Sequence, residues 1–224
     1  MDNTKPHFVI IVAGGTGKRM NSSLPKQFIE IHNKPIIFHT IEKFLSADSS
    51  IHFVISLHPN FVEYWNELIE KHQFNFNHEI VAGGEERFFS VKNALELVPE
   101  NAILGIHDAV RPLVSVETII SCFNTANKFG SAIPMVDSVN SLRYVSQSKN
   151  ESLDRNYIKQ VQTPQYFDSK QIKECYLNNY SRKFTDDASV FEASNSQIKT
   201  VEGNPENIKI TTPIDLIVAK ELLK

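Results

Sequence analysis

A loop near the N-terminus combines glycines with cations, which together suit the binding of phosphate. It follows the apolar run 8–12, which is typical of a short buried strand. Glycines let a backbone approach a ligand and turn its N–H groups inward, while cations supply compensating charge. The loop therefore predicts a polyphosphate site. Its glycines and cations are Gly14, Gly15, Gly17, Lys18, Arg19 and Lys26.

Two common phosphate-binding templates do not fit this loop. The dinucleotide fingerprint needs a glycine where Met20 stands, so a dinucleotide oxidoreductase is a remote alternative. The P-loop needs a glycine at Val12 and Ser or Thr at Arg19. A glycine-rich turn without a function stays open on the glycines alone, and the surrounding cations favour phosphate binding.

Three further polar clusters follow segments that read as strands. They are the run 83–91, the run 107–112 and Lys209. Ligands of open parallel sheets bind outside the carboxyl ends of the strands, so we expect these clusters to meet the glycine loop. The first cluster could also be a tight turn with exposed charges, and Asp108 and Arg111 could also form an internal ion pair. His107 is predicted to be a structural hydrogen-bonding residue.

Apolar runs alternate with amphipathic stretches, which predicts one α/β domain over residues 1–224 with helices on both faces of a mostly parallel sheet. Segment 137–159 is polar with scattered strand formers, and a β-hairpin arm outside the sheet fits it better than a disordered linker. The run 162–167 reads as a turn by its spacing. The expected strands are 8–12, 51–57, 79–82, 102–107, 131–136 and 207–210. The expected helices are 35–45, 90–98 and those starting at Pro59, Ser115, Asp168, Thr185 and Thr212.

Composition excludes several classes of protein. A net charge of −3 provides no basic surface for nucleic acid, and no apolar stretch approaches the length of a membrane span. No signal peptide is visible, so a cytoplasmic location is expected. Cys122 and Cys175 lie in helix-like patterns and are predicted to be buried thiols.

The motifs together resemble those of the sugar-phosphate nucleotidyltransferases, and most closely the 2-C-methyl-D-erythritol 4-phosphate cytidylyltransferase (IspD) family. The resemblance extends from Phe8 to the C-terminus through six motifs in matching order, including 83–91, 107–112, 185–192 and 207–213. It implies a Rossmann-like sheet with a protruding β-arm. It also implies transfer of CMP from CTP to a sugar-alcohol phosphate with release of pyrophosphate, assisted by Mg²⁺.

The resemblance also implies roles for individual residues. The catalytic residues are Arg19, Lys26, Arg155 and Lys209. The nucleotide-binding residues are Ala13, Gly14, Gly15, Gly17, Gly84, Glu85, Arg87, Ser90, Asp108 and Ala109. The acceptor-binding residues are Asp108, Arg111, Ser138, Arg155, Thr163 and Lys209. No protein ligand is expected for Mg²⁺, which the CTP phosphates would hold. Asp186 and Asp187 read as acids in the first turn of a helix.

Two departures from the family pattern leave alternatives open. Ser138 stands where the family usually has Thr, and this change keeps the hydroxyl. Gly14 stands where the methylerythritol enzymes usually have alanine, which keeps a D-ribitol 5-phosphate cytidylyltransferase as the alternative. A non-catalytic CTP sensor on the same fold is a third reading. Family members are homodimers, so the arm 137–159 is expected to reach the partner's site.

Overall fold

A mostly parallel sheet forms the centre of the molecule in the computed structural model, which describes residues 5–15, 24–177, 180–194 and 196–224. The strand order is β10–β7–β11–β6–β1–β4–β5, and β12 pairs with β7. β1 pairs in parallel with β4 on one side and with β6 on the other. The strands are β1 (His7–Ala13), β4 (His52–Leu57), β5 (His78–Ala82), β6 (Ile103–Asp108), β7 (Ser131–Asp137), β10 (Lys159–Val161), β11 (Gln165–Asp168) and β12 (Thr200–Glu202).

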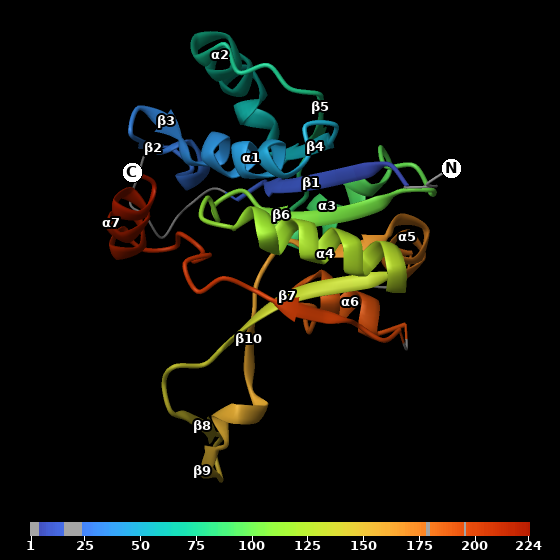
Figure 1. Cartoon of the computed structure of the whole chain (residues 1–224), viewed down its shortest axis with the longest axis vertical. Coiled ribbons are helices and arrows are strands. Elements are labelled where there is room, and N and C mark those ends of the chain that lie inside the picture. The colour runs from blue at the N-terminus through green and yellow to red at the C-terminus, as the bar shows by residue number, and fades with distance from the viewer. Residues whose placement is uncertain (1–4, 16–23, 178–179, 195) are drawn as a thin grey trace.

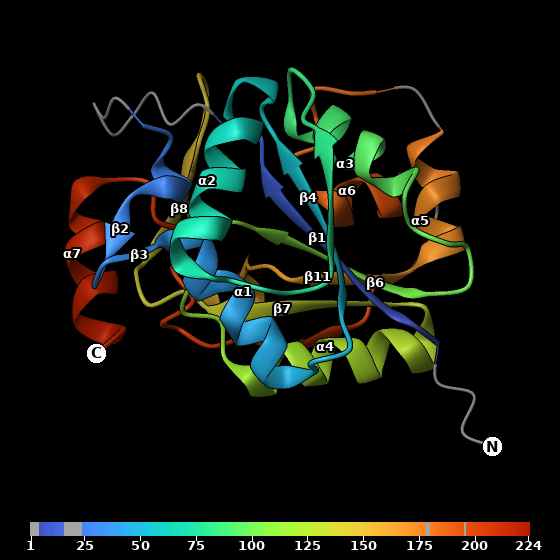
Figure 2. The same ribbon diagram turned by 90° about the horizontal axis from the view of Figure 1, so that it is seen from above.

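Helices cover both faces of this sheet, as predicted (Figures 1 and 2). Val9 and Ile11 of β1 pack in one core with α1, α2 and α4, while Phe8 and Ile10 pack in the other with α3, α5 and α6. Successive residues of a strand point to opposite faces, so a run that is apolar throughout marks a strand buried on both sides. The helices are α1 (Ile36–Ala47), α2 (Val62–His72), α3 (Arg87–Leu95), α4 (Val116–Phe129), α5 (Ser169–Tyr176), α6 (Asp187–Glu192) and α7 (Pro213–Leu222).

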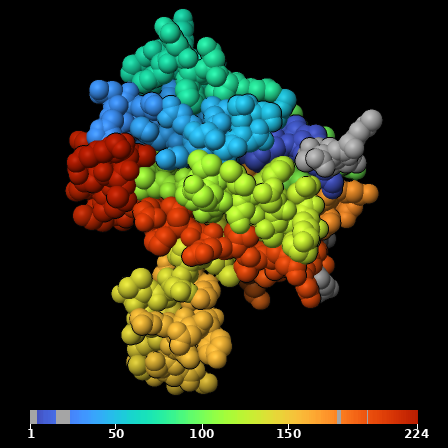
Figure 3. All heavy atoms as spheres, viewed as in Figure 1, coloured from blue at the N-terminus to red at the C-terminus, as the bar shows by residue number. Residues whose placement is uncertain are grey.

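The predicted arm projects from the body of the molecule, below it in Figures 1 and 3. It contains the antiparallel hairpin of β8 (Leu142–Val145) and β9 (Asn150–Leu153), which lies outside the central sheet. A 3₁₀ turn, η4 (Arg155–Tyr157), leads back into β10. Large apolar side chains on the arm remain exposed, notably Val139 and Tyr157 at 83% and 84%.

Three segments differ from the sequence-based prediction. The run read as a turn contains β11, which inserts antiparallel between β6 and β7. The predicted strand 207–210 is irregular chain without a strand partner, and its described backbone–backbone bond to the body joins the Ile210 N–H to the Val110 carbonyl. The predicted helix 90–98 is α3, which begins earlier, at Arg87, and ends at Leu95.

Helix capping explains two of the helix starts. Ser115 and Asp168 cap α4 and α5 through their side chains, as predicted. The prediction that Thr185 caps the next helix is wrong by one residue, because Asp186 accepts the Ser189 N–H and completes a capping box. Shorter elements are η2 (Lys26–Phe28), η3 (Pro59–Phe61), β2 (Glu30–Ile31) and β3 (Lys34–Pro35). In the described part of the chain, no helix has the length and apolarity needed to cross a membrane.

Candidate active site

The predicted clusters meet around a cavity of about 350 Å³ at the carboxyl ends of β1 and β6. We call it the glycine-loop cavity. Its lining brings together most of the residues that the sequence had assigned to a nucleotide. These are Ala13, Gly14, Gly15, Gly84, Glu85, Arg87, Ser90, Asp108 and Ala109. The predicted catalytic residues Lys26 and Lys209 also line the cavity, together with Val12, Gln27, Glu86 and Val110. Gly17 and Arg19 lie outside the described residues.

Gln27 holds the glycine loop, a role that the sequence analysis missed. Its buried side-chain amide donates to the Ala13 carbonyl at 2.7 Å and to the Gly15 carbonyl at 3.1 Å. These bonds fix the start of the loop from its far side in the sequence. The signal in the sequence was the run Leu24–Gln27, which closes the loop.

The loop after β5 is built around Gly84 and Ser90. A Cβ on Gly84 would lie 2.3 Å from the Cβ of Phe89, so only glycine allows the chain to pass this helix. The Ser90 hydroxyl accepts the Gly84 N–H at 3.1 Å and donates to the Glu86 carbonyl at 3.1 Å. Ser90 therefore shapes the loop from within, and its contact with a base stays a prediction.

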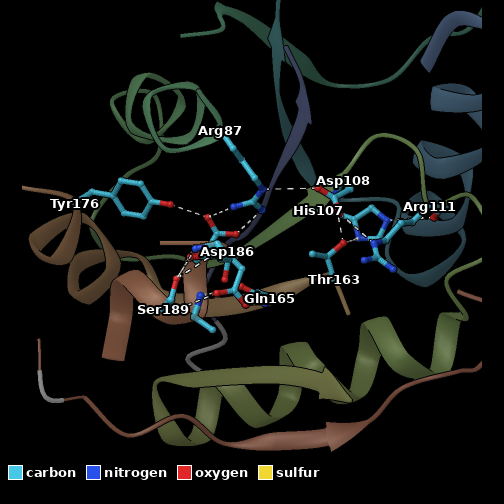
Figure 4. A network of polar contacts seen from close by, with 12 residues as sticks. Arg87, His107, Asp108, Arg111, Thr163, Gln165, Tyr176, Asp186 and Ser189 are labelled. Carbon is cyan, nitrogen blue, oxygen red and sulfur yellow. Dashed lines mark hydrogen bonds and ion pairs between the residues drawn. The ribbon is translucent and has the colours of Figure 1, made fainter. Parts of the chain in front are cut away.

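Asp108, at the end of β6, is the centre of a charged network (Figure 4). Its Oδ2 lies 3.0 Å from Lys209 Nζ and 3.1 Å from Arg111 Nε, and its Oδ1 lies 3.7 Å from Arg87 Nε. The internal ion pair considered for Asp108 and Arg111 therefore exists within a larger set of cations. Burial alone would raise the pKa of Asp108. Lys209, Arg87 and Arg111 outweigh burial and hold that pKa far below its usual range.

A second cavity, of about 240 Å³, lies on the other side of the same network. We call it the Thr163 cavity. It shares Arg87, Asp108 and Lys209 with the first, so these residues form the boundary between the two. Its other lining residues are Arg111, Val161, Gln162, Thr163, Gln165, Thr185 and Asp186.

His107 and Thr163 are uncharged residues that form hydrogen bonds with the backbone of Arg111 and Asp108. The Thr163 hydroxyl accepts the Asp108 N–H at 3.2 Å and lies 3.0 Å from His107 Nδ1, while His107 Nε2 lies 3.2 Å from the Arg111 carbonyl. Burial lowers the pKa of His107 to about 3, so the ring is neutral at pH 7. Its predicted structural role is confirmed.

Lys26 and Lys209 lie close together, although they are far apart in the sequence. Lys26 Nζ donates to the carbonyl of Ile210, the residue after Lys209, at 2.9 Å. Arg111 in turn holds the segment 207–210, because its Nη1 donates to the Asn207 carbonyl at 2.8 Å. The two lysines therefore line one cavity from opposite ends of the chain.

Ser138 and Arg155 behave differently from the other predicted residues. Both lie on the arm side of the molecule, and neither lines either cavity of its own chain. The Ser138 hydroxyl donates to the Asn140 carbonyl at 3.3 Å, and Arg155 donates to the Val139 carbonyl at 2.7 Å.

Asp187 has a contact that the sequence analysis did not predict. It does occupy the first turn of α6, as expected, but its carboxylate is fully buried and faces Arg87. Gln165 of β11 anchors this helix, since it donates to Asp186 Oδ2 and accepts the Ala188 N–H, both at 2.8 Å. Nothing local distinguishes the buried Asp187 from the half-buried Asp186 beside it, so the sequence carried no signal for this arrangement.

The residues around the cavities fit a metal ion held mainly by a ligand. Among the described residues, no group of three or more His, Cys, Asp or Glu side chains is placed to bind a metal. Asp108, the buried carboxylate between the cavities, is already occupied by cationic side chains. That a divalent cation would take most of its oxygen ligands from the CTP phosphates stays a prediction.

Comparisons with known proteins place the whole chain in a family. The family model described as 2-C-methyl-D-erythritol 4-phosphate cytidylyltransferase (IspD) matches residues 7–224. Curated proteins of that name from Bacteroides fragilis and Phocaeicola vulgatus are 48% and 45% identical, each covering 96% of this chain and 98% of its own length. The crystal structure of 4-diphosphocytidyl-2C-methyl-D-erythritol synthase from Anaerococcus prevotii superposes with a TM-score of 0.82 at 27% identity, covering 98% of this chain and 96% of its own.

Proposed function

The chain belongs to the 2-C-methyl-D-erythritol 4-phosphate cytidylyltransferase family, and we propose that it transfers CMP from CTP to 2-C-methyl-D-erythritol 4-phosphate. The products are 4-diphosphocytidyl-2-C-methyl-D-erythritol and pyrophosphate, in non-mevalonate isoprenoid precursor synthesis. The observation that carries this proposal is the boundary formed by Arg87, Asp108 and Lys209 between two adjoining cavities. One cavity would hold the nucleotide and the other the acceptor.

The reaction needs positioning and charge neutralisation more than acid–base catalysis. An oxygen of the acceptor phosphate forms a bond to the α-phosphorus of CTP, and the bond from that phosphorus to the pyrophosphate oxygen breaks. Both partners are anionic, so fixed cations must stabilise the crowded transition state. Lys26 and Lys209 can do this because both line the glycine-loop cavity, and Lys26 Nζ donates to the carbonyl of Ile210, next to Lys209. Arg19 completes the proposed set from within the glycine loop.

The remaining residues bind and orient the two substrates. The glycine loop and the segment 84–90, which runs from the loop after β5 into the first turn of α3, would hold the triphosphate and the base. Arg111 and Thr163 line the Thr163 cavity and would bind the acceptor. Mg²⁺, held by the CTP phosphates, would supply further neutralisation of negative charge when bound. We propose the cytoplasm as the location of the reaction.

Pyrophosphate release from CTP and Mg²⁺ tests the function directly. Parallel reactions contain 2-C-methyl-D-erythritol 4-phosphate or D-ribitol 5-phosphate. Turnover with the first acceptor is expected. Turnover only with the second would overturn the acceptor assignment while keeping the fold and the cations, and CTP binding without turnover would favour the sensor.

We propose further that the protein is a homodimer in which each arm completes the partner's site. Ser138 and Arg155 lie away from the cavities of their own chain, and the arm exposes apolar side chains such as Val139 and Tyr157. Exposed apolar surface of this kind is typical of a protein interface. Dilution that dissociates the dimer should therefore lower specific activity.

Subunit mixing distinguishes a shared site from a self-contained one. Lys26→Ala and Arg155→Ala are each expected to be nearly inactive alone. If Arg155 acts across a twofold interface, re-equilibrated mixtures contain heterodimers with one intact site, and about a quarter of wild-type activity returns. Absence of any recovery, with mixed dimers demonstrated by mass, would show that Arg155 acts within its own chain.

A further inference from the structure

The guanidinium of Arg87 is held by the buried carboxylate of Asp187. Its Nη1 and Nη2 donate to Asp187 Oδ1 at 2.7 Å and to Oδ2 at 2.6 Å, which is the bidentate geometry of a strong ion pair. The Tyr176 hydroxyl donates to the same Oδ1 at 2.6 Å. Asp187 and Tyr176 are buried, whereas the Arg87 side chain remains 25% exposed toward the cavities.

Arg87 lies at the N-terminus of α3, where its positive charge needs the ion pair with Asp187. Arg87 is the first residue of α3 and Asp187 the first residue of α6. A helix N-terminus favours a carboxylate and disfavours a cation, so α3 itself repels the guanidinium. Burial also opposes the charge, yet Asp187 and Asp108 outweigh it and raise the pKa of Arg87.

The ion pair with Asp187 keeps Arg87 at a distance from Asp108. Arg87 is within 2.7 Å of Asp187 on both nitrogens but lies 3.7 Å from Asp108 Oδ1. Asp108 therefore pairs through its other oxygen with Lys209 and Arg111. Without Asp187, the guanidinium would be drawn onto Asp108 and would compete with these two cations.

We propose that Asp187, aided by Tyr176, is a positioning residue that restrains Arg87 so that Asp108 stays paired with Lys209 and Arg111. The inference deepens the proposed function and rests on it for its kinetic consequences. The acceptor phosphate would meet Lys209 and Arg111 from the Thr163 cavity, so a shift of Asp108 changes acceptor binding first.

Steady-state kinetics with each substrate varied separately tests this role. Loss of a charged hydrogen bond of this kind corresponds to a change of roughly tenfold to a hundredfold. Asp187→Asn should therefore lower kcat/KM for the acceptor by about this factor, while KM for CTP changes by less than about threefold. Tyr176→Phe should give a smaller loss of the same kind. Glu192→Gln, at the exposed last residue of α6, should change neither constant.

A double variant separates positioning from simple folding. If Asp187 acts through Arg87, Asp187→Asn should cause no further loss in an Arg87→Gln background, and should raise the thermal stability of that background by removing an unpaired buried carboxylate. Multiplicative losses in kcat/KM, at a temperature where every variant is folded, would overturn the proposal. A rise confined to KM for CTP would do the same.

A crystal structure of Asp187→Asn tests the inference without reference to activity. Arg87 Nε is expected to approach Asp108 Oδ1 more closely than the present 3.7 Å, with Lys209 or Arg111 displaced from Oδ2. An unchanged Arg87 would overturn the positioning role even in an active enzyme. Absence of turnover in the wild type, together with the expected shift in the variant, would instead reject the proposed function and keep the inference.

Discussion

Two buried polar clusters lie at opposite ends of the central strands, and they are built on different principles. At the amino end, His7 Nε2 lies 2.7 Å from the Tyr166 hydroxyl and His7 Nδ1 lies 3.0 Å from Asp48. Burial lowers the pKa of His7, so the cluster is nearly neutral apart from one partly exposed acid. At the carboxyl end, Arg87, Arg111 and Lys209 surround Asp108.

The comparison shows what separates a structural cluster from a functional one in the same sheet. At the amino end, the hydrogen-bonding groups are matched and the charge is small. At the carboxyl end, three cations face the two carboxylates of Asp108 and Asp187, and the excess positive charge borders two cavities. Removing a group at the carboxyl end should therefore cost activity, and removing one at the amino end should cost stability.

Loss of Lys26 should have the largest effect at the carboxyl end. Lys26→Ala is expected to raise the activation barrier by about 3 kcal/mol, or about a hundredfold in turnover, because a preorganised cation is lost from the transition state. The free energy of unfolding should change little, since Lys26 contributes no buried apolar surface to the core. Pyrophosphate release and urea unfolding measure the two quantities.

Lys128→Ala, which removes an exposed cation from α4, is the matched control and should leave both quantities unchanged. A Lys26→Ala protein with near-normal turnover would remove Lys26 from the catalytic set. It would also weaken the contrast between the two ends of the sheet.

Loss of the Tyr166 hydroxyl should produce the opposite result. Tyr166→Phe leaves His7 Nε2 without its buried partner, which should lower the free energy of unfolding by about 2 kcal/mol. Turnover at a temperature well below the unfolding transition should stay at the wild-type level. Tyr144→Phe, on the exposed part of the arm, provides the control for loss of a hydroxyl alone.

Reduced turnover in Tyr166→Phe without reduced stability would contradict the division of roles. It would indicate that β11 transmits changes at the amino end to Gln165 and α6. The strand links the two clusters directly, because Tyr166 belongs to one and Gln165 anchors the helix that carries the other.

The sequence predicted most of the carboxyl-end site, because three of its parts follow apolar strands and the fourth, Lys209, stands in a recognisable motif. The glycine loop, the segment 84–90, Asp108 and Lys209 all contribute to the lining of one cavity. The sequence did not predict β11, since Gln162–Pro164 has the composition of a turn and the strand itself has only four residues. Nor did it predict the burial of Asp187, because that depends on Arg87, one hundred residues earlier in the chain.

The predicted strand 207–210 failed for a related reason. Its alternation of apolar and polar residues is typical of a strand, and Ile210 is indeed buried. Strand formation also needs a free neighbouring edge, and local alternation says nothing about that. The segment lies instead against the loop after β6, where the Ile210 N–H bonds the Val110 carbonyl and Lys209 reaches Asp108.

A lower pH should destabilise the clusters at both ends of the sheet. The expected loss in the free energy of unfolding per pH unit is the smallest of the predicted effects. Burial lowers the pKa of His107 to about 3 from its ordinary value of 6.5, and it also lowers the pKa of His7. In this range the unfolded chain binds a proton that the folded chain does not. Stability is therefore lost as the pH falls below about 6.5, by up to about 1.4 kcal/mol per pH unit for each such histidine.

The pH window from about 6.5 down to 4 isolates the histidines, because carboxylates with a lowered pKa, such as Asp108, add their own loss only below the ordinary value of 3.8. Urea unfolding at several pH values measures the slope. His7→Gln and His107→Gln should each flatten it, whereas His32→Gln, at an exposed position, should leave it unchanged. A slope that neither variant alters would mean that both rings take up protons in the folded state. The amino-end cluster would then carry charge, and the contrast between the two ends would lie in their cavities alone.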